Sequence, residues 1–285
     1  MAKSHPYALR PDETLGPGLR RILEAMGDDA EELSSLPESQ LPEAVHDLRT
    51  LIKRLRAYLW FVRPVLGPSR YERHIDRLRR AARRLSQARD LEVIQGTLKR
   101  AASPEAHKRE LAALTHVALV VTPKDSSLNP TVALSFLKKS ARTFTHINAK
   151  SRKALEQSRK KWPEPKERLA KAFAATRKAK KKALKDKEAL FVHAWRKKTK
   201  RLLYVLQLIH RVPRIRNHDY LETVDQLQEL LGQHQDAIVT GDHLRLRASN
   251  LDSAKLATVI RVLDRKREKL LEEAEKCWET LLHEV

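Results

Sequence analysis

Histidine, arginine and lysine occur at the same spacing in two separate segments of this 285-residue chain. The first segment is VHDLRTLIKRL from Val45, and the second is VHAWRKKTKRL from Val192. On an α-helix, positions i, i+3 and i+7 lie on one face, so each segment predicts a row of cations beside an apolar stripe. The basic residues are His46, Arg49, Lys53 and Arg54 in the first segment, with Arg56 directly after it, and His193, Arg196, Lys197, Lys200 and Arg201 in the second.

Such a row of like charges predicts a ligand with several anions along its length. Neighbouring cations on a helix repel by a few tenths of a kcal/mol per pair, and a polyanion removes that cost. Arginine offers a bidentate fork to phosphate oxygens, lysine offers a mobile point charge, and histidine gains a proton when phosphate raises its pKa. A basic helix face is more often simply solvated. The repetition of His-x-x-Arg-x-x-x-Lys-Arg argues against that alternative here.

A second pair of motifs follows the first in the same order and at nearly the same spacing. LSQARD ends at Asp90 and LGQHQD ends at Asp236. Two matches in register predict two copies of one helical unit, related by pseudo-symmetry. For Asp90 and Asp236, an N-cap or a salt bridge is favoured over a metal ligand. Arg89 and His234 stand beside them and either line the binding face or have no role in it.

The remaining sequence predicts an all-α protein. Leu, Ala, Lys, Arg and Glu dominate, and these are strong helix formers, while the chain contains 7 glycines. Apolar residues recur with helical period, and prolines separate the segments. The predicted helices are 18–32, 43–62, 71–85, 90–101, a short helix from 105, 132–162, 166–186, 188–210, 220–232, 236–248 and 253–284. The valine-rich segment 114–130 is expected to be a strand-like excursion or a buried loop that joins the halves.

The charge balance favours an anionic partner. Lys and Arg total 58 against 36 Asp and Glu, a net charge of +22, which opposes compaction unless a partner neutralises it. The single cysteine, Cys277, gives no sign of an oxidising compartment. The sequence shows no apolar leader at its N-terminus and no run long enough to cross a membrane. We therefore expect a cytoplasmic location.

The paired VHxxRxxxKRL segments, followed by LSQARDLEVI and LGQHQDAIV, resemble the CHAD family, the conserved histidine α-helical domain. The resemblance implies two pseudo-symmetric antiparallel bundles of about four helices each around a basic central cleft or pore. It implies an N-terminal tail over 1–12, a single domain over 13–285 and repeats over 13–125 and 131–285. It also implies binding of inorganic polyphosphate and, for some members, location on polyphosphate granules. No Glu-x-Glu-x-Lys strand is found, so the chain is similar to stand-alone members.

The resemblance also assigns residues. The family's histidines map to His46 and His193, and its basic positions map to the arginines and lysines of the two segments. Looser basic positions fit Arg20 or Arg21 on the first helix, and Arg177 and Lys181 before the second motif. The chain has Lys53 where the family more often has arginine, Leu203 where a base is expected opposite Arg56, and Ser86 where the second copy has Gly232.

We therefore expect a protein that binds polyphosphate, is not an enzyme and needs no cofactor. Three other functions are alternatives. Charge supports nucleic-acid binding equally well, but aromatic residues make up 5% of the chain and no nucleic-acid-binding motif is found. A metal-dependent phosphohydrolase would use His46 or His193 with Asp90 or Asp236, but no carboxylate cluster or Gly-rich phosphate loop accompanies them. Binding to a membrane surface is a fourth, weaker alternative. The oligomeric state stays open.

Overall fold

The protein is described by a computed structural model that covers residues 6–86, 90–102, 107–121, 129–212, 218–246 and 251–284. Within these ranges every regular element is a helix, which confirms the all-α prediction. The elements are α1 (Leu15–Ser35), the 3₁₀ helix η1 (Glu38–Gln40), α2 (Leu41–Phe61), α3 (Arg63–Leu66), α4 (Pro68–Ser86), α5 (Asp90–Ala101), α6 (Lys108–Val120), α7 (Pro130–Glu156), α8 (Pro165–Asp186), α9 (Ala189–Ile209), α10 (His218–Leu246) and α11 (Ser253–Glu284).

Three stretches differ from the sequence-based expectation. The helix predicted over 132–162 is α7, which ends at Glu156. The valine-rich run that was expected to be a strand or loop is the C-terminal half of α6, because Leu114 and Val117 are fully buried on its inner face. The modest cost of valine in a helix is outweighed by that burial. The two helices predicted over 220–232 and 236–248 are one continuous helix, α10, which passes through Gly232. Residues 122–128 lie outside the described residues.

The chain divides into two compact units, and each draws on separate stretches of sequence. The first unit holds α1, α2, α3, α4 and α7, together with α8 up to Lys178 and α9 from Lys200. The second unit holds α5, α6 and α11, together with α8 from Ala179, α9 up to Thr199 and α10 from Glu222. None of the described helices has an apolar stretch long enough to span a membrane.

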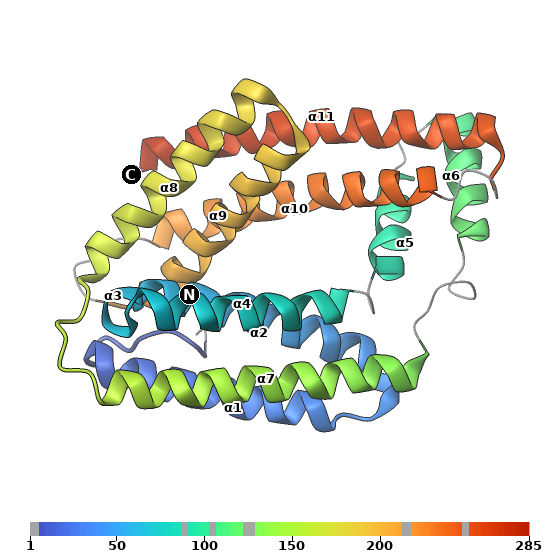
Figure 1. Ribbon diagram of the computed structural model, residues 1–285. Coiled ribbons are helices and arrows are strands. Elements are labelled where there is room, and N and C mark those ends of the chain that lie inside the picture. The colour runs from blue at the N-terminus through green and yellow to red at the C-terminus, as the bar shows by residue number, and fades with distance from the viewer. Residues whose placement is uncertain are drawn as a thin grey trace. The chain divides into compact units, whose positions relative to one another are not determined.

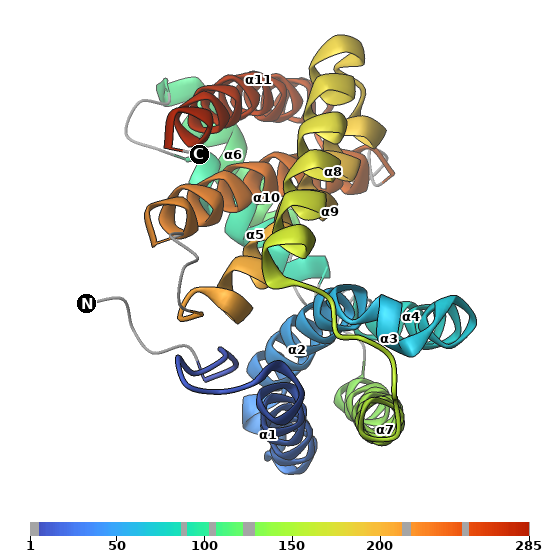
Figure 2. The same ribbon diagram turned by 90° about the vertical axis from the view of Figure 1, so that its left-hand side faces the viewer.

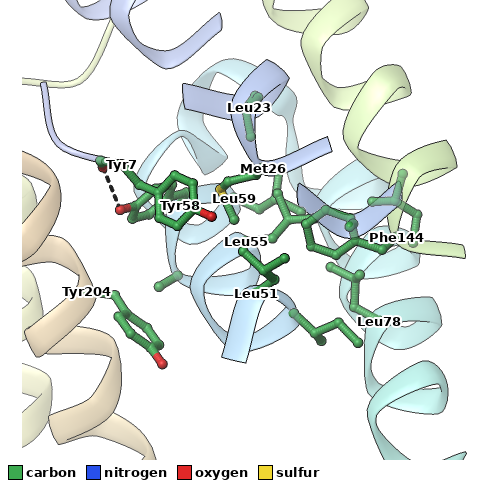
Figure 3. Packing of buried hydrophobic residues seen from close by; sticks show 14 of the residues in the cluster. Tyr7, Leu23, Met26, Leu51, Leu55, Tyr58, Leu59, Leu78, Phe144 and Tyr204 are labelled. Carbon is green, nitrogen blue, oxygen red and sulfur yellow. Dashed lines mark hydrogen bonds between the residues drawn. The ribbon is translucent and has the colours of Figure 1, made fainter. Parts of the chain in front are cut away.

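In the first unit α7 packs against α1, α2 and α4, and α2 also contacts α1 and α4 (Figure 1, Figure 2). Prolines at the starts of α2 and α7 suit the first helical turn, where the missing N–H costs nothing. The shared core includes Met26, Leu55, Tyr58 and Phe144, all of which are at most 1% exposed (Figure 3). This core fixes the rotation of α2 about its axis, and with it the face that carries the first motif.

The second unit has its own core. α11 contacts α5 and α6, and the buried residues include Ile94, Leu114, Leu244 and Val259. Trp195 of α9 meets Trp278 of α11 edge to face, with ring centroids 6.4 Å apart. Trp195 stands in the second motif where Leu48 stands in the first, and both side chains are fully buried. Matching positions of the two motifs therefore anchor their helices in the same way.

Candidate anion-binding site

The two short motifs of the first half meet in the first unit. Arg49 of α2 donates a hydrogen bond from Nη1 to Ser86 Oγ at the end of α4, at 2.5 Å. Ser86 Oγ in turn donates to the carbonyl of Ala82 at 3.0 Å. Ser86, the second residue of LSQARD, thus orients an arginine of VHDLRTLIKRL.

The corresponding motifs of the second half also meet, in the second unit. The guanidinium of Arg196 on α9 lies against Gly232 of α10, so that a Cβ at Gly232 would stand 3.9 Å from Nε and from Nη2. His193 forms a hydrogen bond with the side chain of Gln235. Burial and the charges of Lys197 and Arg196 lower the pKa of His193, and the bond to Gln235 opposes that change. In both halves, therefore, a residue of the LSQARD or LGQHQD motif contacts an arginine of the basic helix that carries the preceding motif.

Aromatic rings hold the basic side chains that are most deeply placed in the first unit. Arg54 is 7% exposed, and its Cζ lies 4.8 Å from the ring centroid of Tyr7 and 5.1 Å from that of Tyr204. Lys200 Nζ lies 5.7 Å from the same Tyr204 ring. Cation–π attraction of this kind holds a charge in place without neutralising it. Figure 3 shows Tyr7 next to Tyr58, with Tyr204 on a neighbouring helix, and Tyr58 Oη donates to the carbonyl of Tyr7 at 2.8 Å.

Five arginines converge from five helices of the first unit, and we call them the arginine cluster: Arg56 (α2), Arg63 (α3), Arg79 (α4), Arg168 (α8) and Arg201 (α9). Trp60 lies among them, with Arg168 Cζ 4.0 Å and Arg201 Cζ 5.0 Å from its ring centroid. Arg168 also donates to the Trp60 carbonyl. Arg56 directly follows the first motif and Arg201 is near the end of the second, so the first unit brings these two residues together.

The arginine cluster is electrostatically costly. Burial lowers the pKa of Arg56, and the charges of Arg79 and Arg201 lower it further. Burial likewise lowers the pKa of Arg168 and of Arg201, which also experience the charge of Arg63. Among the residues with described side chains, no partner meets the buried Nε of Arg56 or of Arg168. The phenol of Tyr71 opposes the lowering of all three pKa values.

Among the described residues, the carboxylates that pair with the cluster lie at its edge. Glu72 lies 3.6 Å from Arg63, and Asp76 lies 2.8 Å from Arg79. All four of these side chains are about half exposed, so water weakens both pairs. An anion that displaced water from the cluster would gain charge-assisted hydrogen bonds and relieve the repulsion between arginines.

The other predicted site residues are spread over several places. His46 is exposed and Lys53 is half-buried, both on α2, and Arg177 and Lys181 are exposed on α8. Arg20 lies 3.9 Å from Glu156 at the surface. Arg21 is held by Glu13 at 2.7 Å and by the Ala8 carbonyl at 2.9 Å, where it fastens the N-terminal segment. Arg89 lies outside the described residues.

His234 and Asp236 lie inside α10 and not at a helix end. His234 is 3% exposed, and burial together with the charge of Arg267 lowers its pKa to about 4. Asp236 lies 3.5 Å from Arg100, so the expected salt bridge to a basic neighbour forms and an N-cap role is wrong. In the described part of the chain, no three His, Cys, Asp or Glu side chains gather as metal ligands would. The side chain of Asp90 is not described.

Several residues of the cluster carry no sequence signal that sets them apart. Arg63, Arg79 and Arg168 lie outside both motifs, and each is one of many arginines in the chain. Tyr7 belongs to the segment predicted as a tail, yet it is 9% exposed and contacts Arg54. A search for aromatic residues near each basic motif would have found Trp60 and Tyr204, since both follow their motif by less than two helical turns.

A family model described as the CHAD domain matches residues 19–245. The crystal structure of the CHAD domain from the plant Ricinus communis matches with a TM-score of 0.62 at 20% sequence identity, over 96% of this chain and 91% of that chain. At this identity the likeness establishes the fold alone. No curated protein matches the chain.

Proposed function

The chain belongs to the CHAD family, and we propose that it binds inorganic polyphosphate without chemically altering it. The observation that carries this proposal is the arginine cluster, in which burial and the charges of Arg79 and Arg201 lower the pKa of Arg56. Charges held this close need a ligand with closely spaced anions. A linear phosphate chain supplies one anion per unit along its whole length.

The chemistry of the side chains favours phosphate over a nucleic acid base. Arginine binds two phosphate oxygens at once, and it supplies most of the cluster. Trp60 and Tyr204 are engaged by cations of the protein, so their faces do not serve as platforms for stacked bases. A protein that holds polyphosphate in this manner would also collect on polyphosphate granules.

The test is a titration of the purified chain with long-chain polyphosphate at two salt concentrations, with duplex DNA as competitor. We expect tight binding that weakens steeply with salt, because each neutralised phosphate releases a counterion. Excess DNA should fail to displace the ligand. Equal displacement by DNA would show general polyanion affinity and would favour the nucleic-acid alternative.

Paired substitutions then locate the site. Arg56→Gln with Arg201→Gln should weaken polyphosphate binding by about tenfold or more, since each removes a charge-assisted contact. The control is Lys108→Gln with Arg109→Gln, which removes the same charge from an exposed turn of α6. Equal losses in the two variants would mean that net charge alone, and not the cluster, sets the affinity.

The motif histidines His46 and His193 allow a separate test of the proposal. Because the pKa of His193 is lowered in the free protein, a bound phosphate must raise it for the ring to donate from both nitrogens. His46→Ala with His193→Ala should therefore weaken binding modestly, and more at pH 6 than at pH 8. A loss of the same size at both pH values would contradict titration of these histidines on binding.

A further inference from the structure

A second group of cations surrounds a pocket of about 610 Å³ in the first unit, between α4 and α7. We call it the basic pocket. Its cationic lining residues are Arg70, Arg73, Arg77, Arg80, Lys150 and Lys153. Among the described residues that line it, Asp76 is the one acid, and its carboxylate accepts a hydrogen bond from Arg79 at 2.8 Å. The pocket therefore carries a large excess of positive charge.

The arginines of the basic pocket follow the helical spacing of the first motif. Arg70, Arg73, Arg77 and Arg80 stand at i, i+3, i+7 and i+10, as His46, Arg49, Lys53 and Arg56 do. With a rise of 1.5 Å per residue, the row extends over about 15 Å along α4. Lys150 and Lys153 face it from α7. A single phosphate ion would reach only part of this row.

The base of the basic pocket is polar and built into the core. His74 is 7% exposed, and its Nδ1 lies 3.0 Å from Ser151 Oγ of α7. Ser151 Oγ donates to the carbonyl of Ile147 at 2.7 Å, so Nδ1 of His74 is within reach of a fixed hydroxyl. Burial lowers the pKa of His74 to about 4, and the charges of Arg70, Arg73, Arg77 and Lys150 contribute. The pKa of the His74 imidazole therefore depends on the cations that line the pocket.

The basic pocket shares no residue with the arginine cluster. Arg79 belongs to the cluster, whereas Arg77 and Arg80 on either side of it line the pocket. Two faces of α4 therefore carry two separate sets of cations. Neither copy of the repeated motif contributes to the pocket.

We propose that the basic pocket is a second anion-binding site, which takes a short linear oligophosphate or one stretch of a longer phosphate chain along α4. The row of guanidinium groups matches a ligand with regularly spaced anions, and a pocket of this volume is in the range of small-ligand sites. The site stands independently of the arginine cluster, because each set of cations can be removed without touching the other.

The first test is equilibrium dialysis with tripolyphosphate. Arg73→Gln, Arg77→Gln and Lys150→Gln combined should weaken binding at one site by about tenfold for each cation removed. The control combines Lys108→Gln, Arg109→Gln and Arg261→Gln, which removes the same charge from exposed positions. Arg56→Gln with Arg201→Gln tests the cluster separately. If the cluster variant binds normally while the pocket variant loses binding, the pocket proposal stands and the cluster proposal fails.

Other results would overturn the pocket proposal. These are equal affinities for the pocket variant and its control, or displacement of tripolyphosphate by sulfate at matched ionic strength. Capture by vesicles that contain a phosphoinositide, with no binding of tripolyphosphate, would assign the pocket to lipid headgroups instead.

A second measurement uses the unmodified protein, so it does not depend on the folding of any variant. The His74 imidazole is followed by NMR through a pH titration, with and without tripolyphosphate. An anion held by the surrounding cations should raise the His74 pKa from about 4 toward its ordinary value. An unchanged His74 pKa under saturating tripolyphosphate would overturn the proposal.

Discussion

Arg49 and Arg196 occupy matching positions of the two motifs but meet different neighbours. Arg49 donates to a hydroxyl, Ser86 Oγ, whereas Arg196 lies against the bare backbone of Gly232. Both arrangements keep a guanidinium close to the second motif, one through a hydrogen bond and one through packing against the helix backbone.

Replacement of Ser86 by alanine should reduce the free energy of unfolding by about 1–2 kcal/mol, because Arg49 loses an acceptor in a half-buried position. Urea denaturation measures the effect. Ser35→Ala is the matched control, because Ser35 also ends its helix and donates to a carbonyl of the preceding turn, but no arginine is recorded on its Oγ in the described structure. Equal losses in the two variants would show that the Arg49 contact contributes nothing.

The buried His234 should make stability depend on pH. Its pKa is about 4 in the folded chain and near 6.5 when unfolded, so the unfolded state binds the proton first as pH falls. Stability is therefore full above about pH 6.5 and falls toward pH 4, by about 2 kcal/mol at pH 5. His234→Gln should flatten this part of the profile in denaturation experiments at pH 7.5 and 5. His146→Gln, at an exposed position of α7, is the histidine substitution to compare with it.

At the scale of the elements, two glycines inside helices differ in the space available for a Cβ atom. Gly232 lies within α10, and a Cβ there would meet Arg196 at an ordinary van der Waals distance of 3.9 Å. Gly18 lies in the first turns of α1, and a Cβ there would stand 2.5 Å from Leu9 and 2.7 Å from Glu13 Oε2. The first glycine weakens a helix, and the second allows the N-terminal segment to pack on α1.

Alanine at these two positions should therefore change stability in opposite directions. Gly232→Ala should raise the free energy of unfolding by about 0.5–1 kcal/mol, through helix propensity and a smaller unfolded-state entropy. Gly18→Ala should lower it by about 1–3 kcal/mol through overpacking. Thermal denaturation of both variants beside the parent chain measures the difference. A destabilised Gly232→Ala protein would mean that Arg196 needs the bare backbone.

At the scale of the whole molecule, the charge of +22 on 285 residues acts against folding. The ion pairs recorded are mostly at exposed positions, such as Arg79 with Asp76 and Arg152 with Glu24, and such pairs contribute little. Repulsion is concentrated in the arginine cluster and the basic pocket. Stability and anion binding are therefore coupled through the same cations.

Sodium chloride should raise the melting temperature, because screening weakens repulsion over distances longer than the surface ion pairs. Each kcal/mol gained corresponds to about 2–4 °C for a chain of this size. Polyphosphate at a far lower concentration should raise it more, since a bound ligand stabilises the folded state by mass action. A melting temperature that falls with salt would show that ion pairs outweigh repulsion. Differential scanning calorimetry measures both effects.

The sequence alone predicted the helical class and most helix bounds, since helical periodicity and proline positions act locally. Asp90–Ala101 and Ser253–Glu284 agree with the prediction residue for residue. The prediction of secondary structure was wrong at 114–120 and at Gly232, where burial against other helices outweighs the local preference of valine and glycine. The match between the two motifs predicted a repeated helical unit, and the structure buries Leu48 and Trp195 at equivalent positions of the two copies.

Only the tertiary structure decided which cations stand together. Arg56 and Arg201 were visible in or beside the motifs. Arg79 joins them only because α4 brings its charge close to both, and Arg168 only because α8 brings its guanidinium to Trp60. The row from Arg70 to Arg80 was present in the sequence, and packing of α4 on α7 made it one wall of a pocket. Periodicity fixes which residues share a face of one helix, whereas charge density in space depends on which faces of different helices meet.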